Sequence, residues 1–242
     1  MPICFALVAA LIANDLKSQS DFWTFGFKLE TQRYNTVVHF IGEYICFATF
    51  LEFPCIAILS ICNLTHLCNS YILQFNNYLA NTDFRELSVK CIGVQNEYNI
   101  IEENVRLLKG ILSTPLLFIS LWSLFNLYVV LTYSLHLEVP PEVIVELVVN
   151  AFTGVGVISF LIICSSKIPE NMLKIKETAS LLIDKYQLNI MNKSKAICVL
   201  DRIEKKNVIY LSACGMIDFK KSLLLTDFGS LFTYGLLILK LN

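Results

Sequence analysis

The chain has 242 residues, of which 55% are hydrophobic and 16% are charged, and its mean hydropathy is +0.61. Soluble domains are about 45–50% apolar and about 25% charged, and the excess here falls in blocks, so the composition excludes an ordinary soluble domain and indicates a helical membrane protein. The formal net charge of −1 argues against nucleic-acid binding, which needs a strongly basic face.

The nine cysteines are scattered, and no two form a Cys-x-x-Cys pair. We interpret them as small buried hydrophobic side chains rather than as disulfides or metal ligands. The three histidines, His39, His66 and His136, are isolated from one another. The sequence therefore predicts no metal site and no cofactor.

The first apolar run, Pro2 to Ala13, is too short to cross a bilayer by itself. No basic residue precedes it, as a signal peptide would require, so we interpret residues 1–13 as the end of a longer span, a partial transmembrane helix. Residues 14–36 then form a loop on one side of the membrane.

The first complete span is predicted over residues 37–64. It carries Glu43 and Glu52, and acidic side chains inside a membrane are costly enough to mark candidate functional positions. The alternative is that the helix begins deeper, near Ile45, which leaves Glu43 among the lipid headgroups. Pro54 lacks an amide donor and is expected to disturb the helix.

Residues 65–111 are more polar but contain a helical pattern. Apolar residues recur there at alternating steps of three and four: Phe84, Leu87, Cys91, Val94, Tyr98, Ile101, Val105, Leu108 and Leu112. This pattern predicts a long helix with one packed seam, and Asp83 followed by Glu86 has the spacing of a helix start. We expect the helix to lead directly into the next span, with its seam facing either its own chain or a neighbouring copy.

Two spans follow, over residues 112–136 and 143–164, joined by a short turn at 137–142 that contains two prolines. In the second of these spans, Gly154 and Gly156 are interpreted as positions of close helix packing rather than as a phosphate loop.

A second polar region, residues 165–221, repeats the one-sided helical pattern and is predicted to be a helical anchor. The members of its seam are Ile168, Met172, Ile175, Ala179, Leu182 and Tyr186. Regions 65–111 and 165–221 hold most of the basic residues and the short turn holds none, so both regions are assigned to the cytoplasm. The turn, the loop at 14–36 and the C-terminus are then extracellular.

The final span is predicted over residues 222–242. About 18 mostly apolar residues separate Lys221 from Lys240, roughly 27 Å of helix. Asp227 lies inside this stretch and is a functional-site candidate; the alternative is that the span starts near Phe228 and Asp227 is interfacial. The fold class is therefore all-α: a polytopic helical membrane protein with four complete transmembrane helices, a partial one and long cytoplasmic helices.

Ala213-Cys-Gly215 before the last span, and Thr233-Tyr234 followed by five apolar residues, resemble the C-terminal signature of arthropod gustatory receptors. That signature closes with Gln-Phe, where this chain has Lys240 and Leu241. The order of spans and cytoplasmic helices also resembles the C-terminal part of this seven-span family. The chain corresponds to about its last four spans, and residues 1–13 to the end of the third.

The resemblance implies a ligand-gated cation channel in the plasma membrane, assembled as a homo- or hetero-tetramer. In the family the final span lines the pore and the cytoplasmic helices share an anchor below the membrane. The residues that this assigns to the pore helix and family motif are Asp227, Thr233, Tyr234 and Lys240. Four copies of the Lys240 ammonium near a pore mouth would repel cations unless the side chain reaches the outer headgroups, so the chain resembles a fragment or a divergent copy.

The family's ligand pocket lies in the outer half of the bundle and suits a small organic molecule, here a tastant. The matching positions are Glu43, Tyr44, Phe125, Tyr128, Tyr133 and Asn150. The alternative is that the aromatic residues among them face membrane lipid.

Two other functions stay open: an odorant receptor of the same superfamily, and an unrelated transporter, although no inverted repeat is visible. No enzyme is expected, because His-Glu-x-x-His and Gly-x-Ser-x-Gly are both missing from the sequence.

Overall fold

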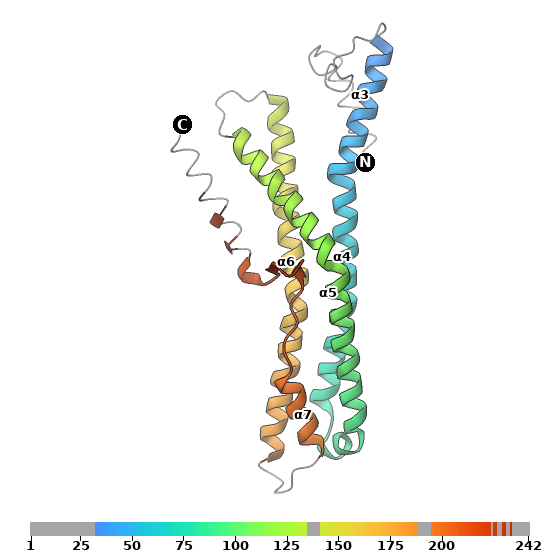
Figure 1. Cartoon of the computed structure of the whole chain (residues 1–242), viewed down its shortest axis with the longest axis vertical. Helices are drawn as coiled ribbons and strands as arrows, with labels where there is room; N and C mark the ends of the chain where they lie inside the picture. Colours follow the sequence, from blue (N-terminus) through green and yellow to red (C-terminus); the bar gives the residue numbers. More distant parts are fainter. Residues whose placement is uncertain are drawn as a thin grey trace. The chain divides into compact units, whose positions relative to one another are not determined.

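The computed structural model describes residues 32–134, 141–187 and 195–223, together with 225, 226, 229, 230 and 233. These residues are almost entirely helical, as the sequence predicts (Figure 1). The elements are α3 Gln32–Phe47, the π-helical turn η1 Ala48–Glu52, α4 Phe53–Asn81, α5 Phe84–Ser134, α6 Pro141–Gln187, α7 Lys195–Lys205, β1 Ser212–Ala213 and β2 Ile217–Asp218. The chain divides into two compact units, Met1–Leu59 and Ser60–Asn242.

Three of the described helices, α4, α5 and α6, are long and apolar enough to cross a membrane. This supports a helical membrane protein. The expectation of four complete spans and a partial one stays a prediction, because residues 1–13 and most of 222–242 lie outside the described residues.

In the first unit, the disturbance expected at Pro54 takes the form of a widened helical turn. Pro54 is the second residue of α4, and the π-helical turn η1 ends at Glu52, directly before α4 begins. A proline has no amide hydrogen and its ring crowds the preceding turn, and a wider turn relieves that crowding.

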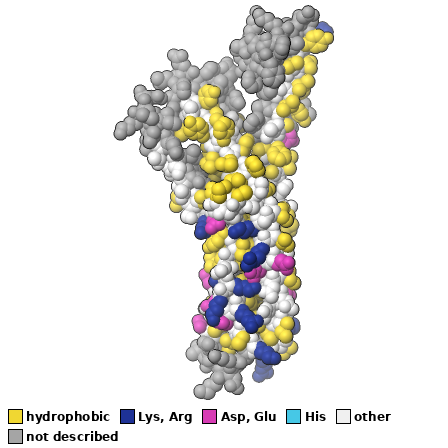
Figure 2. Space-filling view, viewed as in Figure 1, with side chains coloured by type: hydrophobic (Ala, Val, Ile, Leu, Met, Phe, Trp, Pro, Cys, Tyr) yellow, Lys and Arg dark blue, Asp and Glu magenta, His cyan; other side chains and the backbone are white. Residues whose placement is uncertain are grey.

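In the second unit, α5 and α6 each join a charged half to an uncharged half. The charged residues of α5 all precede Gly110, and α6 has none between Glu146 and Lys167. The expected direct passage from the polar helix into the next span is confirmed for α5. Figure 2 shows the result: basic and acidic side chains gather towards one end of the unit, and hydrophobic side chains cover the other.

Both predicted seams are buried. Of the first seam, Leu108 is half-buried, the Phe84 side chain is outside the described part, and the other members are buried: Leu87, Cys91, Val94, Tyr98, Ile101, Val105 and Leu112. All members of the second seam are buried: Ile168, Met172, Ile175, Ala179, Leu182 and Tyr186. Helices α5, α6 and α7 contact one another, so the seams pack within their own chain. Burial of each Leu or Ile side chain stabilises the fold by about 1.5–3 kcal/mol relative to leaving that side chain exposed to water.

Polar side chains fix the register between α4 and α6. The side chain of Asn171 donates a hydrogen bond to Asn69, and that of Thr178 donates one to Asn76, at an O–O distance of 2.8 Å. The two pairs are seven residues apart on both helices and advance in the same direction, so α4 and α6 run parallel here.

The two glycines of α6 behave differently. A β-carbon added at Gly154 would lie 2.9 Å from Leu127 Cγ and 3.3 Å from the Ser123 carbonyl oxygen, so the predicted close packing is confirmed there. The prediction is wrong for Gly156, which is exposed and has no such neighbour within 4 Å. Residues two positions apart on a helix project in directions about 200° apart, so Gly154 and Gly156 cannot both face α5.

The expectation that the cysteines are buried is wrong for most of those described. Only Cys91 is buried; Cys62, Cys68 and Cys164 are half-buried, and Cys55, Cys198 and Cys214 are exposed. All of these are free thiols. For Cys55 on α4, a thiol is apolar enough to tolerate a lipid-facing helix surface, so hydrophobic surroundings in the sequence do not require a packed position.

Candidate functional site

The Ala213–Gly215 segment, which carries part of the family resemblance, forms the turn of a small β-hairpin. Strand β1 pairs antiparallel with β2, with Ser212 opposite Asp218 and Ala213 opposite Ile217. The Met216 amide donates a hydrogen bond to the Ala213 carbonyl oxygen at 2.9 Å. Cys214 (φ 49°) and Gly215 (φ 73°) both have left-handed backbones, which suit a tight hairpin turn and which glycine adopts at little cost.

Buried residues at its base hold the hairpin in place. Leu211, Ser212, Ala213 and Phe219 are all buried, and the Phe219 amide donates to the Leu211 carbonyl oxygen at 2.9 Å. The sequence predicted only a helical region over 165–221. In the structure, α7 ends at Lys205 and the chain continues as extended backbone into this hairpin.

The hairpin turn is attached to α5. The Cys214 amide donates hydrogen bonds to the Ser113 hydroxyl at 2.9 Å and to the Ser113 carbonyl oxygen at 3.3 Å. Ser113 precedes Pro115, a proline inside α5, by two residues. Proline removes one helical hydrogen bond, so it weakens the helix at this point.

The segment after the hairpin is attached to α6 in a similar way. Lys221 Nζ lies 2.8 Å from a Glu170 carboxylate oxygen, and Glu170 is adjacent to Pro169, a proline inside α6. Residues 212–221 therefore bridge two long helices beside their internal prolines, at the level where the uncharged stretches begin. Figure 1 shows the hairpin beside the middle of α5 and α6.

A polar cluster joins the end of α7 to the polar half of α5. Lys206 Nζ donates hydrogen bonds to Asn99 Oδ1, at 2.8 Å, and to the Glu102 carboxylate, and it lies 5.3 Å from the centre of the Tyr98 ring. Arg106 donates two hydrogen bonds to the same carboxylate, at 2.7 and 3.2 Å. The Glu102 carboxylate therefore accepts hydrogen bonds from Lys206 and from Arg106 at the same time.

The cluster shifts the pKa of two groups. Partial burial alone would raise the pKa of Glu102, but hydrogen bonds from Lys206 and Arg106, and their charges, outweigh burial and hold this pKa below its usual value. Burial, together with the nearby Glu102 charge, raises the pKa of Tyr98 to about 12. Glu102 is thus ionised and Tyr98 neutral at physiological pH. The ion pair between Lys206 and Glu102 links the end of α7 to α5.

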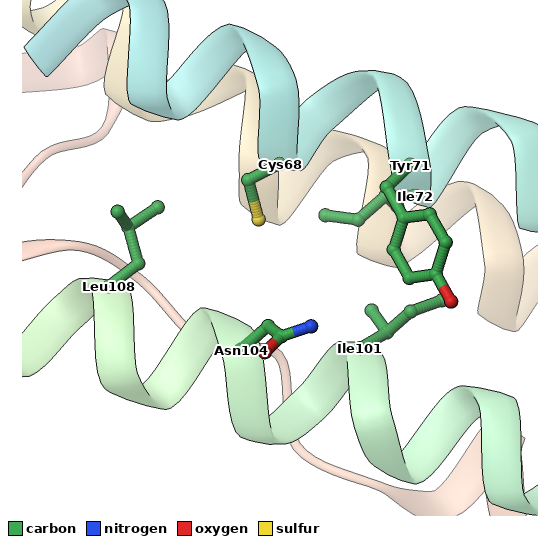
Figure 3. Close-up of a pocket in the computed structure, with 6 residues that line it drawn as sticks. All are labelled: Cys68, Tyr71, Ile72, Ile101, Asn104 and Leu108. Atoms are coloured by element: carbon green, nitrogen blue, oxygen red, sulfur yellow. The ribbon is translucent and has the colours of Figure 1, made fainter. Parts of the chain in front are cut away.

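A cavity of about 240 Å³ lies between α4 and α5 (Figure 3). Its walls are Cys68, Tyr71 and Ile72 from α4, facing Ile101, Asn104 and Leu108 from α5. The lining is mostly apolar, with a thiol, a phenol and an amide as its polar groups. The cavity suits a small apolar molecule, and none of the predicted ligand residues lines it.

The predicted ligand residues are not gathered into a described cavity. Tyr44 on α3 is exposed, as are Phe125, Tyr128 and Tyr133 on α5, and Asn150 on α6 is half-buried. The Glu43 side chain lies outside the described part. The exposed α5 aromatics fit the lipid-facing alternative that the sequence left open, and the assignment to a ligand pocket stays a prediction.

Of the predicted pore residues, only Thr233 is described; Asp227, Tyr234 and Lys240 lie outside the described residues. Thr233 Oγ1 donates to the Gly229 carbonyl oxygen at 2.7 Å. Ser230 and Thr226 each donate in the same way to the carbonyl oxygen four residues earlier. These contacts are typical of Ser and Thr on a helix.

Sequence reasoning missed the hairpin and the Lys206 cluster. The Cys-Gly pair at 214–215 was a turn signal, and the end of periodicity after Lys205 indicated that the helix stops. The contacts of Ser113 and Glu102 join residues about 100 positions apart, and no local pattern reports such pairs.

No known protein-family model matches this chain, and no curated protein matches it in sequence. Among the described residues, no group of three or more His, Cys, Asp or Glu side chains could hold a metal ion.

Proposed function

We propose that the chain is a chemosensory receptor subunit of the gustatory type, or part of one. In this proposal it contributes to a ligand-gated cation channel in the plasma membrane that a small organic tastant opens. The observation that carries it is the Ala213–Gly215 turn. This segment of the resembling motif contacts α5, and Lys221, a few residues later, contacts α6, directly before the stretch proposed to line the pore.

The mechanism proposed for gating uses the two internal prolines. A ligand among the outer halves of the helices changes the tilt of α5 or α6, and each helix bends most easily beside Pro115 or Pro169. The hairpin contacts α5 beside Pro115, and Lys221 after it contacts α6 beside Pro169, so residues 212–221 move with both helices. The displacement passes through Lys221 to the segment with Asp227 and Thr233, which is proposed as the pore helix.

Assembly as a tetramer would use surfaces other than the two seams. The seams are buried within the chain, so contacts between copies are proposed on the exposed apolar faces of the long helices. Large exposed side chains on these faces include Phe118, Leu121, Phe152 and Phe160. Lipid or neighbouring subunits cover such faces in a membrane.

The proposal is tested by expressing the chain in insect cells with a C-terminal epitope tag. We expect antibody to reach the tag on intact cells, and a tastant panel to evoke a cation current. Lys240→Gln, which restores the residue of the resembling signature, should increase that current because it removes four positive charges near the pore mouth. A tag reached only after permeabilisation, with no current from either protein, would refute the proposal.

A further inference from the structure

A cleft of about 330 Å³ lies between the end of α7 and the polar half of α5. It is lined by Gln95, Tyr98, Asn99, Arg202, Ile203, Lys205 and Lys206. Three of these side chains are cationic, two are neutral amides and none is a carboxylate. The volume falls within the range of small-molecule sites.

The cations of the cleft are not equally neutralised. Lys206 is paired with Glu102, and Lys205 lies 2.8 Å from an Asp201 carboxylate oxygen. Arg202 is exposed and forms no ion pair with any described residue. Its guanidinium is therefore available, and a guanidinium binds phosphate through two parallel hydrogen bonds.

One uncharged donor in the wall is also without a partner. Gln95 is half-buried and its amide makes no hydrogen bond in the part of the chain that is described. Phosphate oxygens are acceptors of the kind that this amide lacks.

The position of the cleft favours a soluble ligand over a lipid. Asn99 precedes Gly110 by 11 residues, which is about 17 Å along α5 from where the uncharged stretch begins. A lipid headgroup held at the membrane surface would not reach that far. A phosphorylated small molecule in the cytoplasm would reach the cleft freely.

We propose that this cleft binds a phosphorylated small organic anion, which bridges α7 and α5 through Arg202, Lys205 and Lys206. The ligand adds a second link between the helices already joined by Lys206 and Glu102. Its occupancy would stabilise the position of α7, and through it the start of the hairpin. This inference does not depend on the channel proposal.

The test measures binding of inositol trisphosphate to the full chain in nanodiscs of phosphatidylcholine. Uncharged inositol is the matched ligand control. We expect inositol trisphosphate to bind, inositol not to bind, and the affinity to fall as salt is raised. Arg202→Gln should weaken binding about tenfold, because one bidentate charged contact is lost. Lys174→Gln, which removes an exposed charge of α6 outside the cleft, should change the affinity less than about twofold.

Several results would overturn the proposal. Equal binding by wild type and Arg202→Gln would remove the cleft as the site. An equal loss in Lys174→Gln would indicate general attraction to basic residues. If the chain binds phosphatidylinositol bisphosphate in the nanodisc but does not bind soluble inositol trisphosphate, the ligand is a lipid. No binding of either form would leave the cleft without a phosphorylated ligand.

Discussion

Asn171 Nδ2 donates a 2.6 Å hydrogen bond to Asn69 Oδ1, and both side chains are buried between α6 and α4. In an apolar interface such a pair is costly to break, because the remaining amide is left without a partner. The pair therefore holds two parallel helices at one register and penalises any shift along their axes.

Replacing one member of this pair should destabilise the protein. We expect Asn69→Leu to lower the free energy of unfolding by about 1–3 kcal/mol, because it leaves the Asn171 amide unsatisfied. The double variant Asn69→Leu/Asn171→Leu should recover much of the loss. Thermal unfolding in detergent, followed by circular dichroism, measures both. Asn77→Leu, on an exposed position of the same helix, is the control, and an equal effect there would contradict the assignment.

The two glycines of α6 provide a matched pair of substitutions. Gly154→Ala forces a β-carbon against Leu127 and should cost about 1–3 kcal/mol of stability. Gly156→Ala meets no neighbour and should stabilise the helix by up to about 1 kcal/mol, because alanine is the better helix former. Melting temperatures of the two variants should therefore move in opposite directions. If both substitutions shift the melting temperature in the same direction, α5 and α6 do not approach each other closely at Gly154.

Glu102 should make stability depend on acid pH. Its folded-state pKa is lowered, so its contribution is present above the unfolded-state value, near 4.5, and is lost as pH falls through the folded-state value. Glu102→Gln should cost about 1 kcal/mol at pH 7, and this difference from wild type should shrink below about pH 4.5. Melting temperatures across pH 3–7 give the comparison. Glu103→Gln, at the exposed neighbouring position, should show no such difference; a constant gap for Glu102→Gln would refute the ion pair.

The contact between the hairpin and α5 can be tested by cross-linking. The Cys214 amide bonds to Ser113, so Ser113→Cys places a second thiol next to Cys214. Under mild oxidation we expect a disulfide that links peptides about 100 residues apart, detected by mass spectrometry after proteolysis. The double variant Ser113→Cys/Cys214→Ser should lack that peptide pair. If the Ser113→Cys protein forms only cross-links to other cysteines, the hairpin does not lie on α5.

The periodic parts of the fold were predictable from the sequence. The steps of three and four from Leu87 to Leu112, and from Ile168 to Tyr186, named residues that are buried in the structure, except for the half-buried Leu108. A helix with a charged, solvent-exposed face buries its apolar stripe, so a regular apolar stripe indicates the packed side. The same logic predicted that α5 continues from its polar half into its apolar half.

The partners of these stripes were not predictable. The sequence left open whether the first seam faces its own chain or another copy, and only the contacts among α5, α6 and α7 answer this. The predictions for Gly156 and for Cys55, which is exposed on α4, failed for a related reason. In a membrane, lipid is as apolar as a protein core, so an apolar residue on a span carries no information about which of the two it faces.

The candidate site was predictable only in part. Ala213-Cys-Gly215 was noticed as a motif, but its conformation depends on positive backbone angles at Cys214 and Gly215 and on a bond to Ser113. The Lys206 cluster likewise depends on a long-range contact, the ion pair between Lys206 and Glu102. Such contacts follow from the tertiary arrangement, which no local window of sequence contains.

The prolines of α5 and α6 divide each helix into arms of unequal length. On α5 the arm before Pro115 is the longer, roughly 46 Å against about 30 Å, whereas on α6 the arm after Pro169 is the shorter. If each helix bends at its proline, equal bend angles displace the tips of the two charged arms by different distances, because a longer arm sweeps a longer arc. The tips would then slide past each other rather than move together. That shear would fall on the α7 end of the bundle, where Lys206 and Glu102 resist it.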